Sequence, residues 1–246
     1  MAIPTQGSVS FSQLQSEFGG SNPISFSEYY RGGSNVPVGS NTSGIPVSGV
    51  IDISGFRGKT PLADVDYEVI GGGGAGGFGV DDGGEGHRGT YGDSGGTSTL
   101  SGTGFTTITS TGAAGGENCK GGRGTEGTAG STSAYGPGGA GGARNSNGGA
   151  ALSSSYGAGG GGGGGDNGST FDSGGCSGEG GNAAVQQTGT VNPRYGTNLT
   201  IVIGAGGPTN TPGYDGGAGT AGFASIDIDG TETTYSSVGT FTVTVS

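Results

Sequence analysis

Several stretches of the chain alternate apolar and polar residues, as strands with one buried face do. They are Val65–Ile70, 199–203, a Thr-rich pair within 97–110, Phe223–Ile228, Thr231–Tyr235 and 238–245. Asp229-Gly230 lies between two of these stretches and is a strong hairpin signal. Two of the strands run directly into glycine, at 71–77 and at 204–207. The pattern predicts β-strands that bracket a glycine-rich region.

Within that region, glycines recur at every third position in several separate blocks. They include Gly83, Gly86, Gly89, Gly92 and Gly95; Gly121, Gly124, Gly127 and Gly130; and Gly213, Gly216, Gly219 and Gly222. A period of three belongs to the left-handed extended helix, which makes no internal hydrogen bonds and must pair with its neighbours. Collagen is excluded because the chain has only 9 Pro and its triplets are interrupted. A flexible linker is the alternative, but it has no reason to keep glycine in phase. We expect a bundle of polyglycine II helices.

Residues 1–60 have a different pattern, in which a short phrase of Ser and aromatic residues is repeated. Ser12 with Gln15, and Ser25 with Glu28, have capping-box spacing. This predicts brief helices at 13–18 and 28–31, each after a short strand. The predicted fold is mostly irregular and β. A small N-terminal strand-plus-short-helix module (1–60) precedes a glycine-rich domain (61–246), in which polyglycine II helices are bracketed by β-strands. Turns are expected near 112–120, 143–155, 167–171 and 186–195, at the ends of the bundle.

Composition and charge restrict the function. Only 28% of residues are hydrophobic and the formal net charge is −11. This argues against binding to nucleic acid or to an anionic membrane through charge. No apolar run approaches the length of a membrane span, and the N-terminus lacks the features of a secretory signal. A chain without a signal, yet composed like a surface protein, fits a virion component that is assembled in the host cytoplasm.

Catalytic and metal-binding patterns do not stand out. His87 is the single histidine, so neither a His-dependent triad nor a His-rich metal site can be built from this chain. Its acidic neighbours lack calcium-loop spacing and are expected to form a solvated turn. Cys119 and Cys176 are either one bridge or two free thiols. We expect no enzyme activity, no cofactor and no metal.

Three segments carry a resemblance to known proteins. SFSQLQSEFGGSNPISFSEYYRGG resembles N-terminal modules of phage tail and fibre proteins, and DYEVIGGGGAGG and NLTIVIGAGG resemble the glycine-rich domains that follow them. The overall plan is similar to the tip adhesins of T-even-type long tail fibres, although this N-terminus differs from the attachment domain of those adhesins. The resemblance implies an attachment module followed by a sandwich of polyglycine helices, whose distal loops bind the host receptor.

These observations predict a phage adhesin with two binding surfaces. Residues 1–60 would dock on other tail or fibre proteins through apolar residues shared with the partner: Phe11, Leu14, Phe18, Phe26, Tyr29 and Tyr30. Isolated aromatics in Gly/Ser/Asn surroundings would contact a host surface protein or glycan: Tyr135, Tyr156, Phe171 and Tyr195. The alternative for these rings is that each fills a gap in a thin core. The alternative function is a purely structural virion part. Ice binding is disfavoured by bulky residues at off-phase sites.

Overall fold

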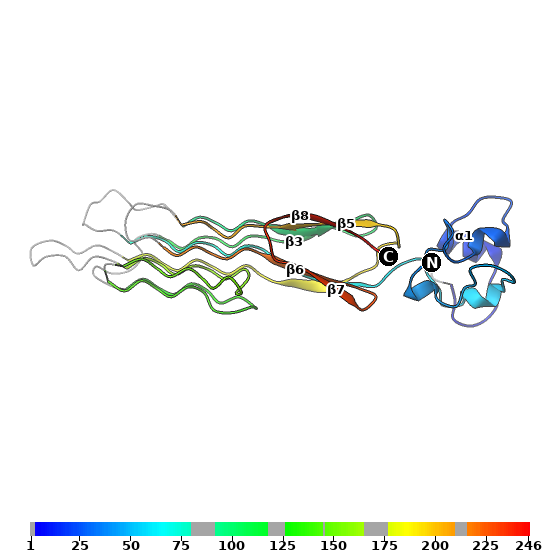
Figure 1. Ribbon diagram of the computed structural model, residues 1–246, viewed down its shortest axis with the longest axis horizontal. Helices are drawn as coiled ribbons and strands as arrows, with labels where there is room; N and C mark the ends of the chain where they lie inside the picture. Colours follow the sequence, from blue (N-terminus) through cyan, green and yellow to red (C-terminus); the bar gives the residue numbers. More distant parts are fainter. Residues whose placement is uncertain (1–2, 80–91, 118–125, 145, 165–176, 210–215) are drawn as a thin grey trace, which may run out of the picture.

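The chain is elongated, with three parts arranged along its long axis (Figure 1). The computed structural model describes residues 3–79, 92–117, 126–144, 146–164, 177–209 and 216–246. The N-terminal module lies at one end, β-sheets occupy the middle, and glycine-rich segments extend to the opposite end, called here the far end. The C-terminus lies near the boundary between module and sheets.

Within the described residues, eight strands form two antiparallel four-stranded sheets. The first has the order β4-β1-β6-β7 and the second β3-β2-β5-β8. The strands are β1 (Val65–Ile70), β2 (Ser98–Ser101), β3 (Ile108–Ser110), β4 (Gln187–Val191), β5 (Asn198–Ile203), β6 (Phe223–Ile228), β7 (Thr231–Tyr235) and β8 (Gly239–Thr244). Alternate residues of both sheets face each other in one core, which includes Val65, Val69, Leu100, Ile201 and Ile226. Strand alternation therefore produces a small β-sandwich.

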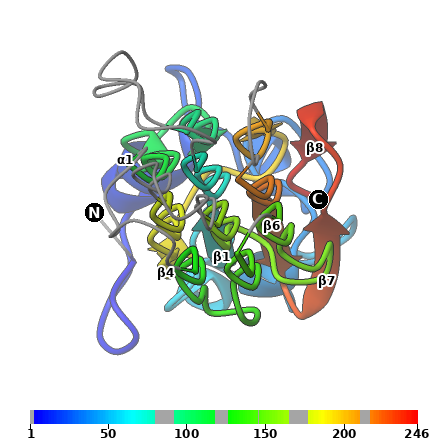
Figure 2. The same cartoon turned by 90° about the vertical axis from the view of Figure 1, so that its left-hand side faces the viewer.

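The glycine-rich segments are direct continuations of these strands. Segments 71–79, 111–117 and 204–209 follow β1, β3 and β5 and run away from the sheets. Segments 92–97, 177–184 and 216–222 run back and lead into β2, β4 and β6. Four further segments, 126–131, 138–143, 146–151 and 157–164, complete the described part of the bundle. The segments lie side by side when the molecule is viewed along its length (Figure 2).

Backbone hydrogen bonds between these segments repeat every three residues. Gly72, Gly73 and Gly74 donate their N–H groups to three different segments at 2.8, 2.9 and 3.0 Å. The next three residues donate to the same segments in the same order, 92–96, 216–222 and 177–182. Carbonyls of segment 71–77 accept from three others, 112–116, 157–164 and 204–207. Segment 71–77 is thus surrounded by neighbours on all sides, and segment 159–164 has the same pattern.

Such packing leaves space for only an occasional methyl group in the middle of the bundle, such as that of Ala75, which is 1% exposed. A Cβ placed at Gly73 would lie 1.9 Å from the carbonyl oxygen of Ala158, and one at Gly161 would lie 2.0 Å from that of Ala140. The nearly uninterrupted glycine runs are therefore the central segments. At the edge, Ala140 and Ala143 point outward and are exposed, so a Gly-Gly-Ala pattern is tolerated in segment 138–143.

The N-terminal module contains one α-helix, three 3-10 turns and a small core. The helix α1 (Phe11–Phe18) precedes η1 (Phe26–Tyr29), η2 (Ser40–Thr42) and η3 (Ile53–Phe56). Leu14, Phe18, Tyr29, Val36 and Phe56 are fully buried in the core of the module. Between residues 3 and 60 the structure contains an isolated bridge, Arg31 with Val36, in place of the short strands that we expected.

Local details of the module also correct the prediction. The capping box of α1 is formed by Ser10 and Gln13, not by Ser12 and Gln15, so the helix begins two residues earlier than expected. The Ser25 hydroxyl accepts from the N–H of Ser27, and η1 ends at Tyr29.

The predicted strands of the sandwich are present, and one strand was missed. Residues 186–195 were expected to form a turn, but Gln187–Val191 is the edge strand β4, paired with β1. Residues 112–116 were also assigned to a turn, whereas Ala113 and Gly116 donate to the carbonyls of Gly72 and Ala75 within the bundle. Most of the block 83–95, including Gly86 and Gly89, lies outside the described residues.

Candidate functional site

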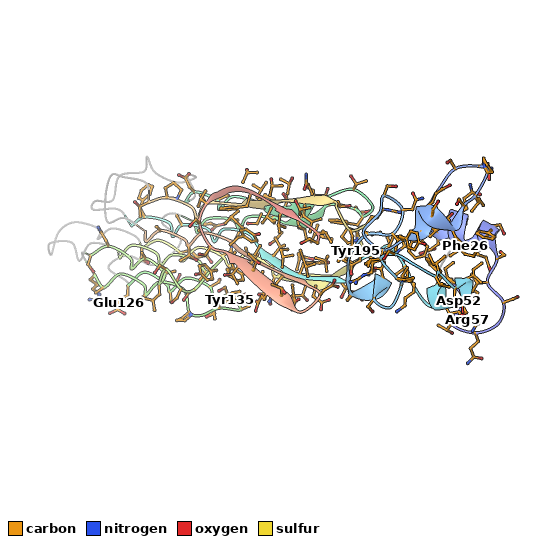
Figure 3. All side chains as sticks on the ribbon, turned by 45° about the vertical axis from the view of Figure 1, so that its right-hand side comes forward. Phe26, Asp52, Arg57, Glu126, Tyr135 and Tyr195 are labelled. Atoms are coloured by element: carbon orange, nitrogen blue, oxygen red, sulfur yellow. The ribbon has the colours of Figure 1, made fainter. Side chains whose placement is uncertain are left out.

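Two of the predicted receptor contacts come together in one aromatic cluster. Tyr135 and Tyr156 are partly buried, and their ring centroids are 5.4 Å apart. Both pack on Phe223, which begins β6, with centroid distances of 4.9 Å. The cluster covers Ile70 at the end of β1, on the outer face of the first sheet. Tyr135 and Tyr156 therefore lie where the bundle meets the sheets, and not at the far end; Figure 3 shows the position of Tyr135.

Polar groups fix the position of Tyr135 in this cluster. Its hydroxyl donates to Oε1 of Glu68, which also accepts from Nε2 of Gln186. Burial, the bond to Glu68 and the nearby carboxylates raise the pKa of Tyr135, because the phenolate would be desolvated beside negative charge. This arrangement favours the gap-filling interpretation of Tyr135.

Tyr195 lies at the opposite side of the sheets, against the N-terminal module (Figure 3). It is only 6% exposed, and its hydroxyl donates to Oδ2 of Asp229 at 2.7 Å. The Ser40 hydroxyl donates to Oδ1 of the same carboxylate at 2.9 Å. A Cβ at Gly39 would lie 2.0 Å from the Tyr195 ring, so the module backbone packs directly on that ring. A receptor would find little of the Tyr195 ring accessible; the residue is part of the junction between module and sheets.

The charges at this junction are held by hydrogen bonds. Partial burial raises the pKa of Asp229, but the bonds from Tyr195 and Ser40 outweigh this effect and lower it overall. Arg194 donates from Nη2 to the carbonyl oxygens of Phe18 at 2.8 Å and Asn35 at 3.2 Å. The junction therefore joins the module to the sheets through specific polar contacts.

The predicted docking residues of the module divide into two groups. Leu14, Phe18 and Tyr29 have no exposed surface, because they form the core of the module. Phe11 is 37% exposed and pairs with the partly buried Phe26 at a centroid distance of 4.6 Å. Tyr30 is also partly buried, and its hydroxyl donates to the carbonyl of Gly49. Docking through the complete predicted set would require the module to unfold.

At the far end, the described residues include two exposed charged side chains, Glu126 and Arg144. Arg144 follows segment 138–143, whose Gly142 accepts from the N–H of Gly127, the residue after Glu126. Figure 3 shows Glu126 at the end opposite the module. Phe171, His87, Cys119 and Cys176 lie outside the described residues.

The described part of the chain contains no group of three or more His, Cys, Asp or Glu side chains placed to hold a metal ion. None of its helices has the length and apolar character that a bilayer crossing requires. A comparison of the chain with protein-family models, with curated proteins and with solved structures finds no match.

Sequence reasoning missed the residues that organise these sites. Glu68 and Gln186 hold Tyr135, and Arg194 and Asp229 hold the module. Asp229 was recognised only as a turn residue. The one available signal was a charged residue, Arg194, next to the aromatic Tyr195 in a chain with only 8 Lys and Arg.

Proposed function

We propose first that the glycine-rich segments are polyglycine II helices. The support is the rotation of hydrogen-bond partners, in which successive residues bond to three different neighbours and every third residue returns to the first. An α-helix bonds within itself and a strand bonds to two sides, whereas a helix of three residues per turn presents three sides in rotation.

We further propose that the protein is an adhesin at the tip of a phage tail fibre or spike. In this proposal the module docks on other tail or fibre proteins, and the far end meets a protein or glycan on the host surface. The observation that carries the proposal is the backbone core of the bundle, together with the position of the module at the opposite end. Residues at the far end can then change without disturbing a side-chain core, which suits a receptor-binding end.

The charge of the chain supports an uncharged or cationic receptor. Residues 1–60 hold three basic residues and three acidic ones, so the formal net charge of −11 belongs to residues 61–246. An anionic receptor surface would repel this part of the chain at low salt.

The proposal is tested by competition for adsorption on the bacterial host of the phage that encodes the chain. The purified protein should block adsorption of the particles. A charge-swapped variant, Glu126→Lys with Arg144→Glu, alters the far end without changing the net charge and should compete at least about tenfold less well. A matched swap on the module, Glu28→Lys with Arg57→Glu, should compete like the wild type. Absence of competition by the wild-type protein would exclude the adhesin.

A purely structural virion component is the second candidate. The observation that favours it is the position of Tyr135, Tyr156 and Tyr195, which pack against other residues near the sheets. If the protein is structural, particles lacking it should show an assembly defect while the purified chain does not compete for adsorption.

A further inference from the structure

Three strongly exposed valines lie on adjoining loops of the N-terminal module. Val50 is 93% exposed, Val47 67% and Val38 56%. The loops are held together by segment 30–32. The N–H of Arg31 donates to the carbonyl of Pro46, the residue before Val47.

The other two loops are held by the same segment. The Tyr30 hydroxyl donates to the carbonyl of Gly49, next to Val50. The N–H of Gly32 donates to the carbonyl of Val36, two residues before Val38. We call Val38, Val47 and Val50 the valine patch.

This patch lies in the longest uncharged stretch of the module. Between Arg31 and Asp52 the sequence contains no charged residue. The module as a whole carries no net charge, while residues 61–246 carry −11. An uncharged surface with exposed valines is therefore attached to a strongly acidic body. Isolated exposed apolar residues need no explanation, but a group on neighbouring loops indicates an interaction surface.

We propose that two copies of the chain associate through their valine patches. A two-fold contact is self-complementary, so each valine of one copy meets the patch of the other and the apolar area doubles. Between two copies, charge favours a contact through the modules over a contact through the bodies, because the module carries no net charge. If two copies associated side by side through residues 61–246, two surfaces that each carry a formal net charge of −11 would be brought together.

The size of the module makes this separation effective. A 60-residue unit has a radius of gyration of about 10 Å, and the Debye length at physiological ionic strength is about 8 Å. Two modules in contact hold the acidic bodies apart by several Debye lengths, provided the two-fold axis directs the bodies to opposite sides. The association goes beyond the proposed adhesin function and does not depend on it.

The test is sedimentation equilibrium of the purified full-length chain and of two triple variants. Val38→Ser, Val47→Ser and Val50→Ser remove the patch. The matched control, Leu152→Ser, Val185→Ser and Val238→Ser, removes equally exposed apolar residues of the body, which are 64%, 70% and 57% exposed. All six side chains are on the surface, so the thermal midpoints of both variants should match the wild type.

We expect the wild type and the control to be dimers. The patch variant should dimerise at least about 100-fold more weakly, because burial of a valine contributes roughly one order of magnitude in affinity. Added sulfate should strengthen the wild-type dimer, as it does apolar contacts generally.

A wild type that stays monomeric at all concentrations would refute the proposal. If the wild type is monomeric and the patch variant is not incorporated into particles, the valine patch binds another virion protein instead of a second copy. Equal dimerisation of all three proteins would place the contact elsewhere. Adsorption competition is measured separately, so failure here leaves the adhesin proposal standing.

Discussion

The central glycines offer the sharpest test of how the bundle is held together. Gly160 lies in segment 157–164, and a Cβ there would be 1.8 Å from the carbonyl oxygen of Gly217 and 2.4 Å from its carbonyl carbon. Carbon atoms pack at about 3.5 Å or more, so Gly160→Ala requires two segments to separate by about 1.5 Å. Gly149 is the control, because a Cβ there meets its nearest atoms, in Ala140, at 3.3 Å.

The expected cost follows from the contacts that this separation disturbs. The N–H of Gly160 donates to Gly74 at 3.0 Å, and its carbonyl accepts from Gly181 at 2.8 Å. Overpacking costs about 1–3 kcal/mol, and each weakened hydrogen bond about 1 kcal/mol. Replacing glycine by alanine also lowers the conformational entropy of the unfolded chain, which stabilises the folded state by about 0.4–1 kcal/mol. The free energy of unfolding should fall by roughly 2–4 kcal/mol for Gly160→Ala and by less than about 1 kcal/mol for Gly149→Ala.

Thermal unfolding followed by circular dichroism and calorimetry measures the difference. For a chain of this size each kcal/mol lowers the Tm by about 2–4 °C. Gly160→Ala should therefore lower the Tm by roughly 10 °C, whereas Gly149→Ala should leave it within a few degrees. If the two variants unfold at the same temperature, backbone close packing does not limit the stability of the bundle.

Three further predictions concern the junction and the aromatic cluster. Because the folded pKa of Asp229 is lowered, its contribution to the stability of the junction is present above the unfolded pKa of about 3.9 and is lost as the pH falls through the folded pKa. Limited proteolysis of residues 60–64, which connect the module to β1, should therefore speed up in acid for the wild type but not for Asp229→Asn; the same pH profile for both proteins would contradict this role. Because the folded pKa of Tyr135 is raised, its contribution to the free energy of unfolding is complete below the unfolded pKa of about 10 and is lost as the pH rises through the folded pKa. Thermal unfolding measured from neutral to alkaline pH should show a smaller decrease of the Tm for Tyr135→Phe than for the wild type. Arg194→Ala removes both bonds to the module, so small-angle scattering should show a more variable module position while the Tm of the body stays unchanged; an unchanged scattering curve would mean that Arg194 does not fix the module.

Strands with strong local signals were predictable with correct bounds. Phe223–Ile228 and Thr231–Tyr235 alternate clearly around Asp229-Gly230, and the structure pairs them as β6 and β7. The strand β4 lacks such a signal, because Thr188, Gly189 and Thr190 are all exposed on the sheet edge. Its position is determined by pairing with β1, which lies more than a hundred residues earlier in the chain.

The start of α1 shows a different limit. Ser10 with Gln13 and Ser12 with Gln15 have the same spacing, so a local capping rule cannot choose between them. The structure uses Ser10.

The roles of the tyrosines depend on contacts between distant parts of the chain. Tyr195 meets Ser40 and Gly39, about 155 residues earlier, and Tyr135 meets Glu68. The composition around each ring, rich in Gly, Ser and Asn, indicates exposed turns. This composition carries no information about which turn folds back onto a sheet. The sequence alone therefore could not tell which of these tyrosines lie at the far end and which pack near the sheets.

The core of the bundle also determines how the protein responds to temperature. Unfolding normally raises the heat capacity because apolar surface becomes hydrated, whereas exposure of polar groups lowers it. In segments 71–77 and 159–164 the buried material is mostly peptide groups bonded to other peptide groups. The heat-capacity increment per residue should therefore lie below the usual value of about 12–15 cal/mol/K. A smaller increment flattens the curve of the free energy of unfolding against temperature. On cooling, the bundle should therefore lose less stability than a protein with an apolar side-chain core.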